Sequence, residues 1–316
     1  MSRFCPICDQ PRRPLYKWQG YQSFRCRGCG SETLDRFPSA EELRLFYQAI
    51  SSKKMTDDRR RLERVDHAFE GYLEAYRRAM GTNLPARFLD LGGGVGYWAR
   101  AAHDRGIEAW LADWAFDALG FAGSRMKLPR RVCLDVGRCS GALRPASFDF
   151  VLARHVIEHL VDPRRFLRHV GRTLSPEGLL LIETPNVASN EQLAHPGVTY
   201  ETFRVLRRSN PSMSLAALIK HALSKSPSGL NPPKHLWGFT AAGLRHLLEE
   251  AGFEIVEVHR PVAGHPVYDP LYYELTRREG LQGRGVAVLE RTLSSLFWGR
   301  GMNLAILARR GPEEGA

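Results

Sequence analysis

The sequence predicts an α/β fold in which a small N-terminal ribbon precedes a doubly wound, mostly parallel sheet. Three observations support this prediction. Two Cys-x-x-Cys pairs lie near the N-terminus. From residue 87 onward, short apolar runs typical of strands alternate with helical patterns. Between the first such run and the first helix lies a loop with glycine at every second position, and such a loop indicates a bound ligand.

Length and composition limit the alternatives. The chain has 316 residues, 43% of them hydrophobic, which is enough for one large domain with an appendage and a substantial core. We find no run of about 18 apolar residues and no apolar centre of a signal peptide at the N-terminus. Four of the six cysteines lie in the two pairs, which suits a reducing compartment, so a cytoplasmic protein is expected.

The first 36 residues are predicted to form a zinc ribbon. Cys5 and Cys8 are separated by 17 residues from Cys26 and Cys29. Each pair places two thiolates on one side of a tight turn, and four sulfur atoms complete a tetrahedral, structural zinc site. The residues between the pairs predict a hairpin across Gln19-Gly20. A thioredoxin-like redox site fits less well because it uses a single pair, and a segment this short should depend on metal for its stability.

Charge points to anionic partners without identifying one. Lys and Arg exceed Asp and Glu by 45 − 34, a formal net charge of +11. Such an excess favours nucleic acid, anionic lipid or phosphorylated small molecules. Within the ribbon, basic residues alternate with aromatic ones, which suits single-stranded nucleic acid. In the other interpretation the aromatic residues form a small core and the bases are solvated.

Two helices are predicted between the ribbon and the sheet, over a cap or linker at residues 37–82. Ser39 and Glu42 form a capping box before an apolar run. Residues 58–80 carry apolar side chains at helical spacing. We expect this segment to cover an edge of the sheet and the mouth of the ligand site.

The spacing of the glycine loop excludes two ligand classes. The pattern is Asp90-x-Gly92-x-Gly94-x-Gly96. The dinucleotide fingerprint G-x-G-x-x-G would need glycine where Tyr97 stands, and a phosphate-binding P-loop would need Lys and Ser or Thr after its last glycine. A tight turn without a ligand is the remaining alternative.

The strands that follow each end in a polar residue. Residues 107–112 predict a second strand ending at Asp113, an acid placed to accept from ribose hydroxyls or, alternatively, to cap a helix. Residues 131–134 predict a third strand, ending at Asp135 and Val136. The fourth, at 148–153, leads into a helical turn at 154–160, and the fifth, at 179–183, ends in Thr-Pro-Asn.

These motifs resemble the class I S-adenosylmethionine (SAM) methyltransferases that act on small molecules and glycans. The resemblance runs from F-D-x-V through H-V-I-E-H-L, L-S-P-E-G and L-I-E-T-P-N, then resumes at residues 235–253 and 302–309. It implies a seven-stranded, Rossmann-like sheet at residues 83–316. The length and the turn residues of 187–234 indicate a lid-like insertion within it. Some members carry an N-terminal zinc ribbon, including sugar C-methyltransferases and one type of ribosomal-RNA methyltransferase. This chain lacks the long C-terminal extension of the former and the proline-rich signature of base amino-group methylation.

The resemblance implies SAM as cofactor, with Asp90 and the glycines around its methionine end, Asp113 on its ribose and Asp135 near its adenine. The expected cofactor contacts are Asp90, Gly92, Gly94, Gly96, Asp113, Asp135, Val136 and Arg154.

The turn after the fourth strand supplies candidate catalytic residues. His155 and His159 are i, i+4 neighbours with Glu158 beside them, and histidine titrates near neutrality, so either could accept a proton from a hydroxyl. His235 and His195 are further candidates. Three alternatives stay open: the Glu-His pair is structural, His155 presents mainly its backbone to SAM, or the turn binds a divalent metal. Relatives that do bind one carry Glu where this chain has His155.

The predicted function is SAM-dependent methyl transfer to a small-molecule or glycan-type metabolite, which could be phosphorylated, at oxygen rather than carbon or nitrogen. One alternative is an RNA methyltransferase that holds its substrate with the basic ribbon. Another is a non-catalytic SAM-binding scaffold.

Overall fold

The computed structural model describes residues 3–18, 20–51, 59–81, 84–137, 143–188, 214, 230, 232–259 and 303–311. His195 and most of the 187–234 insertion lie outside these residues. The chain forms two compact units. The first comprises Met1–Pro38, Pro185–Leu244 and Arg260–Leu304, and the second Ser39–Thr184, Arg245–His259 and Ala305–Ala316.

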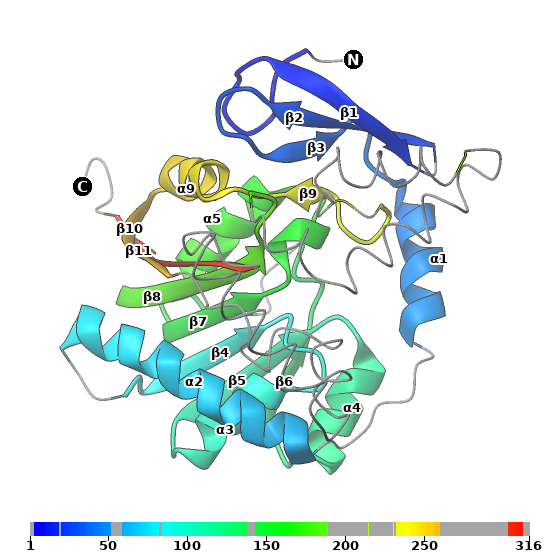
Figure 1. The fold of residues 1–316 in the computed structure, drawn as a ribbon. Coiled ribbons are helices and arrows are strands. Elements are labelled where there is room, and N and C mark those ends of the chain that lie inside the picture. Colours follow the sequence, from blue (N-terminus) through cyan, green and yellow to red (C-terminus); the bar gives the residue numbers. More distant parts are fainter. Residues whose placement is uncertain are drawn as a thin grey trace, which may run out of the picture. The chain divides into compact units, whose positions relative to one another are not determined.

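The second unit is built on a seven-stranded sheet in the order β10-β11-β8-β7-β4-β5-β6 (Figure 1). Parallel pairs join β4 to β5 and β7, β5 to β6, and β7 to β8, whereas β10 and β11 are antiparallel. The predicted seven-stranded, mostly parallel sheet is therefore confirmed. The strands are β4 (Arg87–Leu91), β5 (Glu108–Asp113), β6 (Arg130–Cys133), β7 (Phe148–Arg154), β8 (Leu174–Pro185), β10 (Phe253–His259) and β11 (Asn303–Arg310).

Helices complete this unit. They are α1 (Ala40–Ser51), α2 (Arg59–Met80), α3 (Tyr97–Asp104), α4 (Phe116–Ser124), the short 3-10 turn η1 (Ile157–His159) and α5 (Pro163–Thr173), with α9 (Ala241–Glu250) continuing into it from the first unit. The capping box of α1 is confirmed, because Ser39 N donates to Glu42 Oε2 and Glu42 N donates to Ser39 Oγ. Among the described residues, no helix combines the length and hydropathy needed to cross a membrane.

The core of the second unit lies between α2 and the sheet. The apolar stripe predicted for α2 is buried, and the ring of Phe69 packs edge-on against Phe88 of β4 with centroids 5.2 Å apart. Phe88 in turn lies 5.6 Å from Phe150 of β7. All three rings are fully buried. Each such ring contributes roughly 1.5–3 kcal/mol of transfer free energy, so packing rather than helix propensity holds α2 in place.

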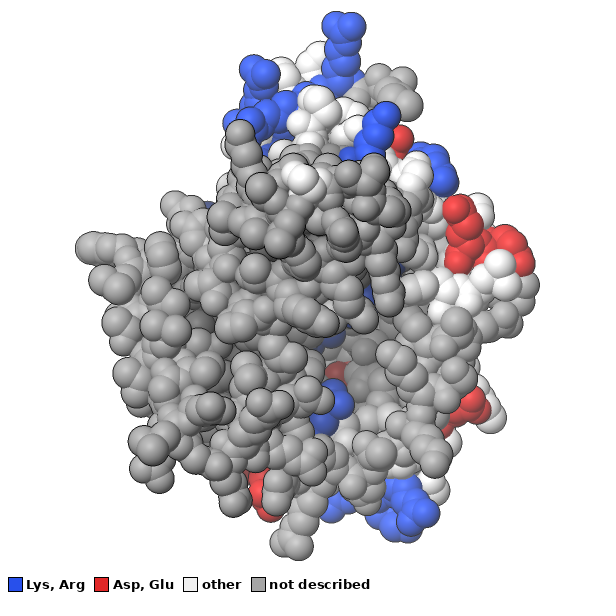
Figure 2. Space-filling view, turned by 45° about the vertical axis from the view of Figure 1, so that its right-hand side comes forward, with Lys and Arg blue, Asp and Glu red and all other residues white. Residues whose placement is uncertain are grey.

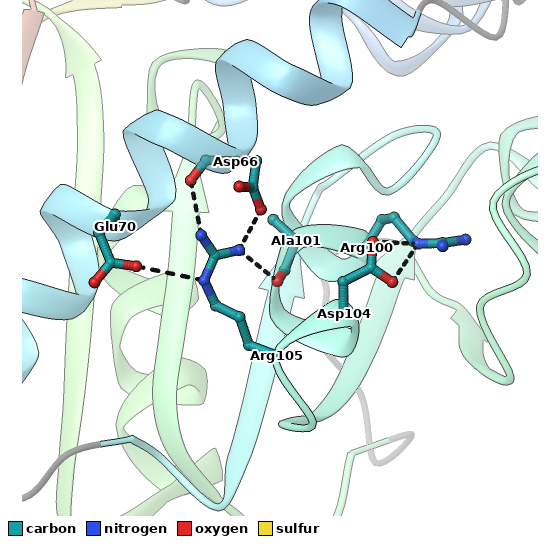
Figure 3. Close-up of polar contacts among 6 residues, drawn as sticks. All are labelled: Asp66, Glu70, Arg100, Ala101, Asp104 and Arg105. Carbon is teal, nitrogen blue, oxygen red and sulfur yellow. Dashed lines mark hydrogen bonds and ion pairs between the residues drawn. The ribbon is translucent and has the colours of Figure 1, made fainter.

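Arg105, just after α3, ties that helix to α2 (Figure 3). Its guanidinium donates to the Asp66 carboxylate, to Asp66 O at 3.1 Å and to Ala101 O at 3.0 Å, and its Nε lies 3.4 Å from Glu70 Oε2. These contacts of Arg105 fix α3, the helix that begins at the glycine loop.

We expect Arg105→Gln to lower the free energy of unfolding by about 1 kcal/mol. The loss is small because Asp66 and Glu70 are 53% and 41% exposed, so solvent screens their charges. Arg245→Gln is the matched control, since it breaks only an exposed i, i+4 pair with Glu249 and should cost less than about 0.5 kcal/mol. Denaturant unfolding measures the free energy of unfolding of both variants. Equal losses would show that the Arg105 contacts contribute no more than a surface ion pair.

The first unit contains a four-stranded sheet in the order β1-β2-β3-β9. Its strands are β1 (Arg12–Trp18), β2 (Tyr21–Cys26), β3 (Glu32–Leu34) and β9 (Trp237–Gly238). The predicted hairpin between β1 and β2 is confirmed, with Gly20 at φ 79° in its turn. The sequence did not indicate β3 or its antiparallel partner β9, which returns from a distant part of the chain.

Candidate functional site

The glycine loop joins β4 to α3 at the carboxyl edge of the sheet. Gly92, Gly94 and Gly96 all have positive φ, at 77°, 58° and 84°. A Cβ on Gly96 would lie 2.6 Å from a Leu128 methyl carbon, so this glycine is needed for packing. Among the described residues, a Cβ on Gly94 would meet no atom within 4 Å. Gly94 is therefore the part of the loop that opens onto space for a ligand.

Asp113, at the end of β5, holds the loop in this shape. Its Oδ2 accepts from Gly94 N at 2.8 Å, and its Oδ1 accepts from Ala115 N at 2.8 Å. The side chain is 5% exposed, and burial raises its pKa despite these hydrogen bonds. The acid expected at the ribose is thus adjacent to the most open glycine.

Asp90 lies beneath the loop. It is 1% exposed, and its Oδ2 accepts from Ala99 N of α3 at 3.2 Å. A Cβ on Gly93 would come within 2.2 Å of this carboxylate, so Gly93, which sequence reasoning passed over, has no room for a side chain. Burial chiefly raises the pKa of Asp90 to about 7, with the charge of Asp113 adding to it.

This raised pKa predicts a pH-dependent cost. Asp90 loses its proton near pH 3.8 in the unfolded chain but near pH 7 in the folded one, so stability falls as pH rises through this window. We expect Asp90→Asn to raise the melting temperature more at pH 8 than at pH 5. A protein of this size shifts roughly 2–4 °C per kcal/mol. An equal gain at both pH values would contradict a buried charge at this position.

On the other side of Asp113, the turn after β6 contains Asp135 and Val136. Asp135 is exposed and its Oδ1 accepts from Gly137 N at 2.9 Å, while Val136 is buried. Two large apolar side chains that sequence reasoning missed, Trp114 and Phe116, follow Asp113 and are 45% and 76% exposed. Exposed apolar side chains beside an acid suit a flat heterocycle.

The turn after β7 brings three of the five candidate catalytic residues together. His155 has φ 53°, rare for a residue with a side chain, and its backbone N donates to Glu183 O at 2.8 Å. Its Nδ1 lies 3.1 Å from Glu158 Oε1. Glu158 is 1% exposed and accepts from Thr184 Oγ1 at 3.0 Å, and His159 Nε2 lies 3.9 Å from the same carboxylate.

The remaining candidates lie elsewhere. Arg154 ends β7, and its Nε donates to Glu183 Oε1 at 3.1 Å. His235, half-buried just before β9, belongs to the first unit, whereas the histidine–glutamate turn belongs to the second. Glu183, which is fully buried, was not singled out by sequence because a single acid within an apolar strand has no distinguishing pattern.

The four ribbon cysteines converge in the first unit. Their sulfur atoms all lie within 4.8 Å of one another, with Cys5 and Cys29 4.0 Å apart and Cys8 and Cys26 3.5 Å apart. Four thiolates at about 2.3 Å from a tetrahedral zinc would be spaced by roughly 3.8 Å. Backbone N–H groups of Ile7 and Gly28 also point at Cys5 and Cys26 sulfurs, at 3.4 and 3.3 Å. The donor set fits zinc.

Comparisons with known proteins agree with this geometry. A family model described as a methyltransferase domain matches residues 63–258. A protein of Mycobacterium tuberculosis described as a probable S-adenosylmethionine-dependent methyltransferase is 28% identical over 152 residues. These are 48% of this chain and 54% of that protein, so the chain spans about half the length of this curated relative. The ubiquinone biosynthesis O-methyltransferase of Azorhizobium caulinodans is 32% identical over 127 residues, 39% of this chain and 38% of that protein.

One solved structure shows the same fold. It is the 1,6-didemethyltoxoflavin-N1-methyltransferase of Burkholderia thailandensis, with a TM-score of 0.50 and 16% identity. The match covers 95% of this chain and 100% of that one. At this identity the likeness concerns the fold alone.

Proposed function

We propose that this chain, which belongs to the methyltransferase domain family, transfers a methyl group from SAM to an oxygen atom of a small-molecule or glycan-type metabolite. The observation that carries the proposal is the glycine loop: Gly94 opens onto space while its N–H is held by Asp113. Saturable binding of SAM to the purified chain tests it.

Residues at three places along the carboxyl edge of the seven-stranded sheet could contact the cofactor. Asp113 would meet the ribose, the exposed Trp114 would lie against the adenine, and the loop around Gly94 would lie under the sulfur-bearing chain. When bound, SAM supplies an electrophilic methyl group. The protein must align the accepting atom with that group and remove a proton from a hydroxyl.

We assign the proton acceptor to His155. The Glu158 carboxylate, 3.1 Å from Nδ1, favours a proton on that nitrogen, so that Nε2, which lies 3.8 Å from Glu183 Oε1, would be the acceptor. Thr184 holds the second carboxylate oxygen, so Glu158 cannot turn away without losing a buried hydrogen bond. A histidine oriented by a buried acid suits deprotonation of a hydroxyl, which is why we favour oxygen as the acceptor.

We expect His155→Asn to keep SAM binding and to lose methyl transfer by about 10²–10⁴-fold, the usual contribution of a general base. The assay follows labelled methyl groups from SAM into small-molecule and glycan fractions. His169→Asn, on the outer helix α5, is the matched control and should transfer normally. Full activity of His155→Asn would exclude this residue as the base.

The four cysteines support a second part of the proposal, a structural zinc ion held by Cys5, Cys8, Cys26 and Cys29. Thiolate sulfur is the ligand type that such closed zinc sites use. The ion would link the first turn of the ribbon to the turn between β2 and β3. It takes no part in methyl transfer, since a closed four-thiolate site has no open position.

RNA methylation is a second candidate because the ribbon presents basic side chains (Figure 2). Arg13, Lys17 and Arg27 are exposed, and Arg13 lies directly opposite Arg25 across the β1–β2 pair. Arg25 is paired with the buried Glu32, so the attraction for an anionic partner rests on Arg13, Lys17 and Arg27. RNA affinity that falls steeply with added salt, together with methyl incorporation into RNA, would favour this candidate over the metabolite.

A further inference from the structure

Four side chains from four elements form a closed ring of contacts in the second unit, which we call the Tyr72 cluster. The ring of Tyr72 on α2 packs on Trp98 of α3, with centroids 5.1 Å apart. The Arg154 guanidinium carbon lies 5.3 Å from the Trp98 ring centroid. Arg154 Nε donates to Glu183 Oε1 at 3.1 Å, and the Tyr72 hydroxyl donates to Glu183 Oε2. Each member therefore contacts two others.

The cluster is polar where packing alone would favour apolar residues. Glu183 and Tyr72 are 0% and 3% exposed, and the Arg154 side chain is 14% exposed. Burying an ion pair costs several kcal/mol per ion, and an apolar group of similar shape often packs as stably. Buried charges of this kind gather at functional sites. We therefore expect the Tyr72 cluster to have a role beyond holding α2 to the sheet.

The strand order locates the cluster relative to the cofactor. Along the sheet edge, Asp113 follows β5, the glycine loop follows β4, and Arg154 ends β7. Glu183 lies in β8, one strand further, and Trp98 is in the first turn after the loop. The cluster is thus on the side of the glycine loop away from Asp113. A cofactor whose ribose met Asp113 and whose adenine lay toward Trp114 would extend its amino-acid end toward this side.

We propose that Arg154 and Trp98 form the wall against the amino-acid end of the cofactor, and that Tyr72 and Glu183 are positioning residues that hold this wall. The inference rests on the proposed function and assigns two residues to it. Glu183 acts through Arg154, and Tyr72 acts through Glu183. The backbone of Glu183 also accepts from His155 N at 2.8 Å, so the same strand places both the wall and the proposed base.

Two probes separate the amino-acid end from the rest of the cofactor. S-adenosylhomocysteine has this end, whereas 5′-methylthioadenosine shares the adenosine and the sulfur but lacks it. We expect Tyr72→Phe to raise the dissociation constant of S-adenosylhomocysteine about tenfold, because it removes the hydroxyl that donates to Glu183 Oε2 and so loosens the carboxylate that holds Arg154. The dissociation constant of methylthioadenosine should stay unchanged. Tyr76→Phe is the matched control, a buried tyrosine one turn further along α2 that packs on Phe150, and should change neither constant.

A second pair of variants guards against misfolding. Glu183→Gln keeps one oxygen that can accept from Arg154, and its amide N–H can donate to the Tyr72 hydroxyl, so it should weaken binding of S-adenosylhomocysteine less than Glu183→Ala does. Calorimetric titration of the full chain measures all of these constants. Equal weakening of both probes, or an unchanged S-adenosylhomocysteine constant in Glu183→Ala, would overturn the positioning role while leaving the proposed function intact. A wild-type chain that binds neither probe would overturn both.

Discussion

We expect Gly94→Arg to abolish binding of SAM while the protein remains folded. The fold should tolerate the change because a Cβ at this position meets no atom of the described part of the chain within 4 Å. The positive φ of 58° adds strain of about 1–2 kcal/mol, which a protein of ordinary stability survives. The arginine side chain then fills the space that the cofactor needs. Calorimetric titration with SAM, alongside a thermal melt of the same sample, measures both effects.

Gly106 provides the control for this experiment. It also has positive φ, at 77°, and a Cβ there would also meet nothing within 4 Å. It precedes β5 and so lies at the amino end of that strand, away from the cofactor edge. Gly106→Arg should therefore carry the same strain and keep full SAM affinity. If both variants bind SAM normally, the glycine loop is a turn without a ligand.

The second large effect concerns the ribbon: Cys26→Ser should reduce bound zinc from one ion per chain to nearly none and unfold the ribbon. Cys26 is buried among the other three sulfurs, and apparent binding energies of structural zinc are about 10–16 kcal/mol in small zinc-dependent folds. The ribbon has few buried side chains with which to replace that energy. Metal analysis gives the zinc content, and trypsin cleavage within β1 and β2 reports unfolding.

Cys133→Ser is the matched control, because Cys133 is exposed and lies in the sheet of the second unit, outside the four-cysteine group. It should retain zinc and protease resistance. A zinc content far below one ion per chain in the wild type would remove the metal from the account altogether.

Loss of zinc should also destabilise the segment around β9. Thr240 Oγ1 donates to Cys29 O at 2.6 Å and its backbone N donates to Ser31 Oγ at 3.2 Å. A Cβ on Gly243 would lie 3.5 Å from the Cys29 sulfur. The turn that carries Cys29 is therefore fixed to the start of α9. Protease cleavage after Lys234 in Cys26→Ser, but not in the wild type, would report this connection.

Local patterns predicted most of the sheet. Parallel strands buried on both faces are continuous apolar runs, so the segments ending at Asp90, Asp113 and Arg154 were visible in sequence. Boundaries were less accurate: β8 spans Leu174–Pro185, against a predicted strand at 179–183, because its first residues are polar or turn-forming. The long helix before the sheet was predicted within one residue, because its apolar stripe has helical spacing throughout.

Contacts between distant residues explain what the sequence could not show. Tyr72 and Glu183 are 111 residues apart, and nothing in either segment marks them as partners. The same holds for Ser31 and Thr240, 209 residues apart, and for the two-residue strand β9, which is too short to leave a pattern. The cofactor loop was visible because its chemistry is contained in consecutive residues, whereas the groups that position it are assembled by the fold.

One measurement tests the central claim most directly: titration of the full wild-type chain with SAM, NAD and ATP in parallel. The spacing of the glycine loop and the carboxylate of Asp113 on Gly94 N predict a single saturable site for SAM and no binding of the other two nucleotides. Saturable binding of NAD or ATP in place of SAM, or no binding of any of the three, would contradict it.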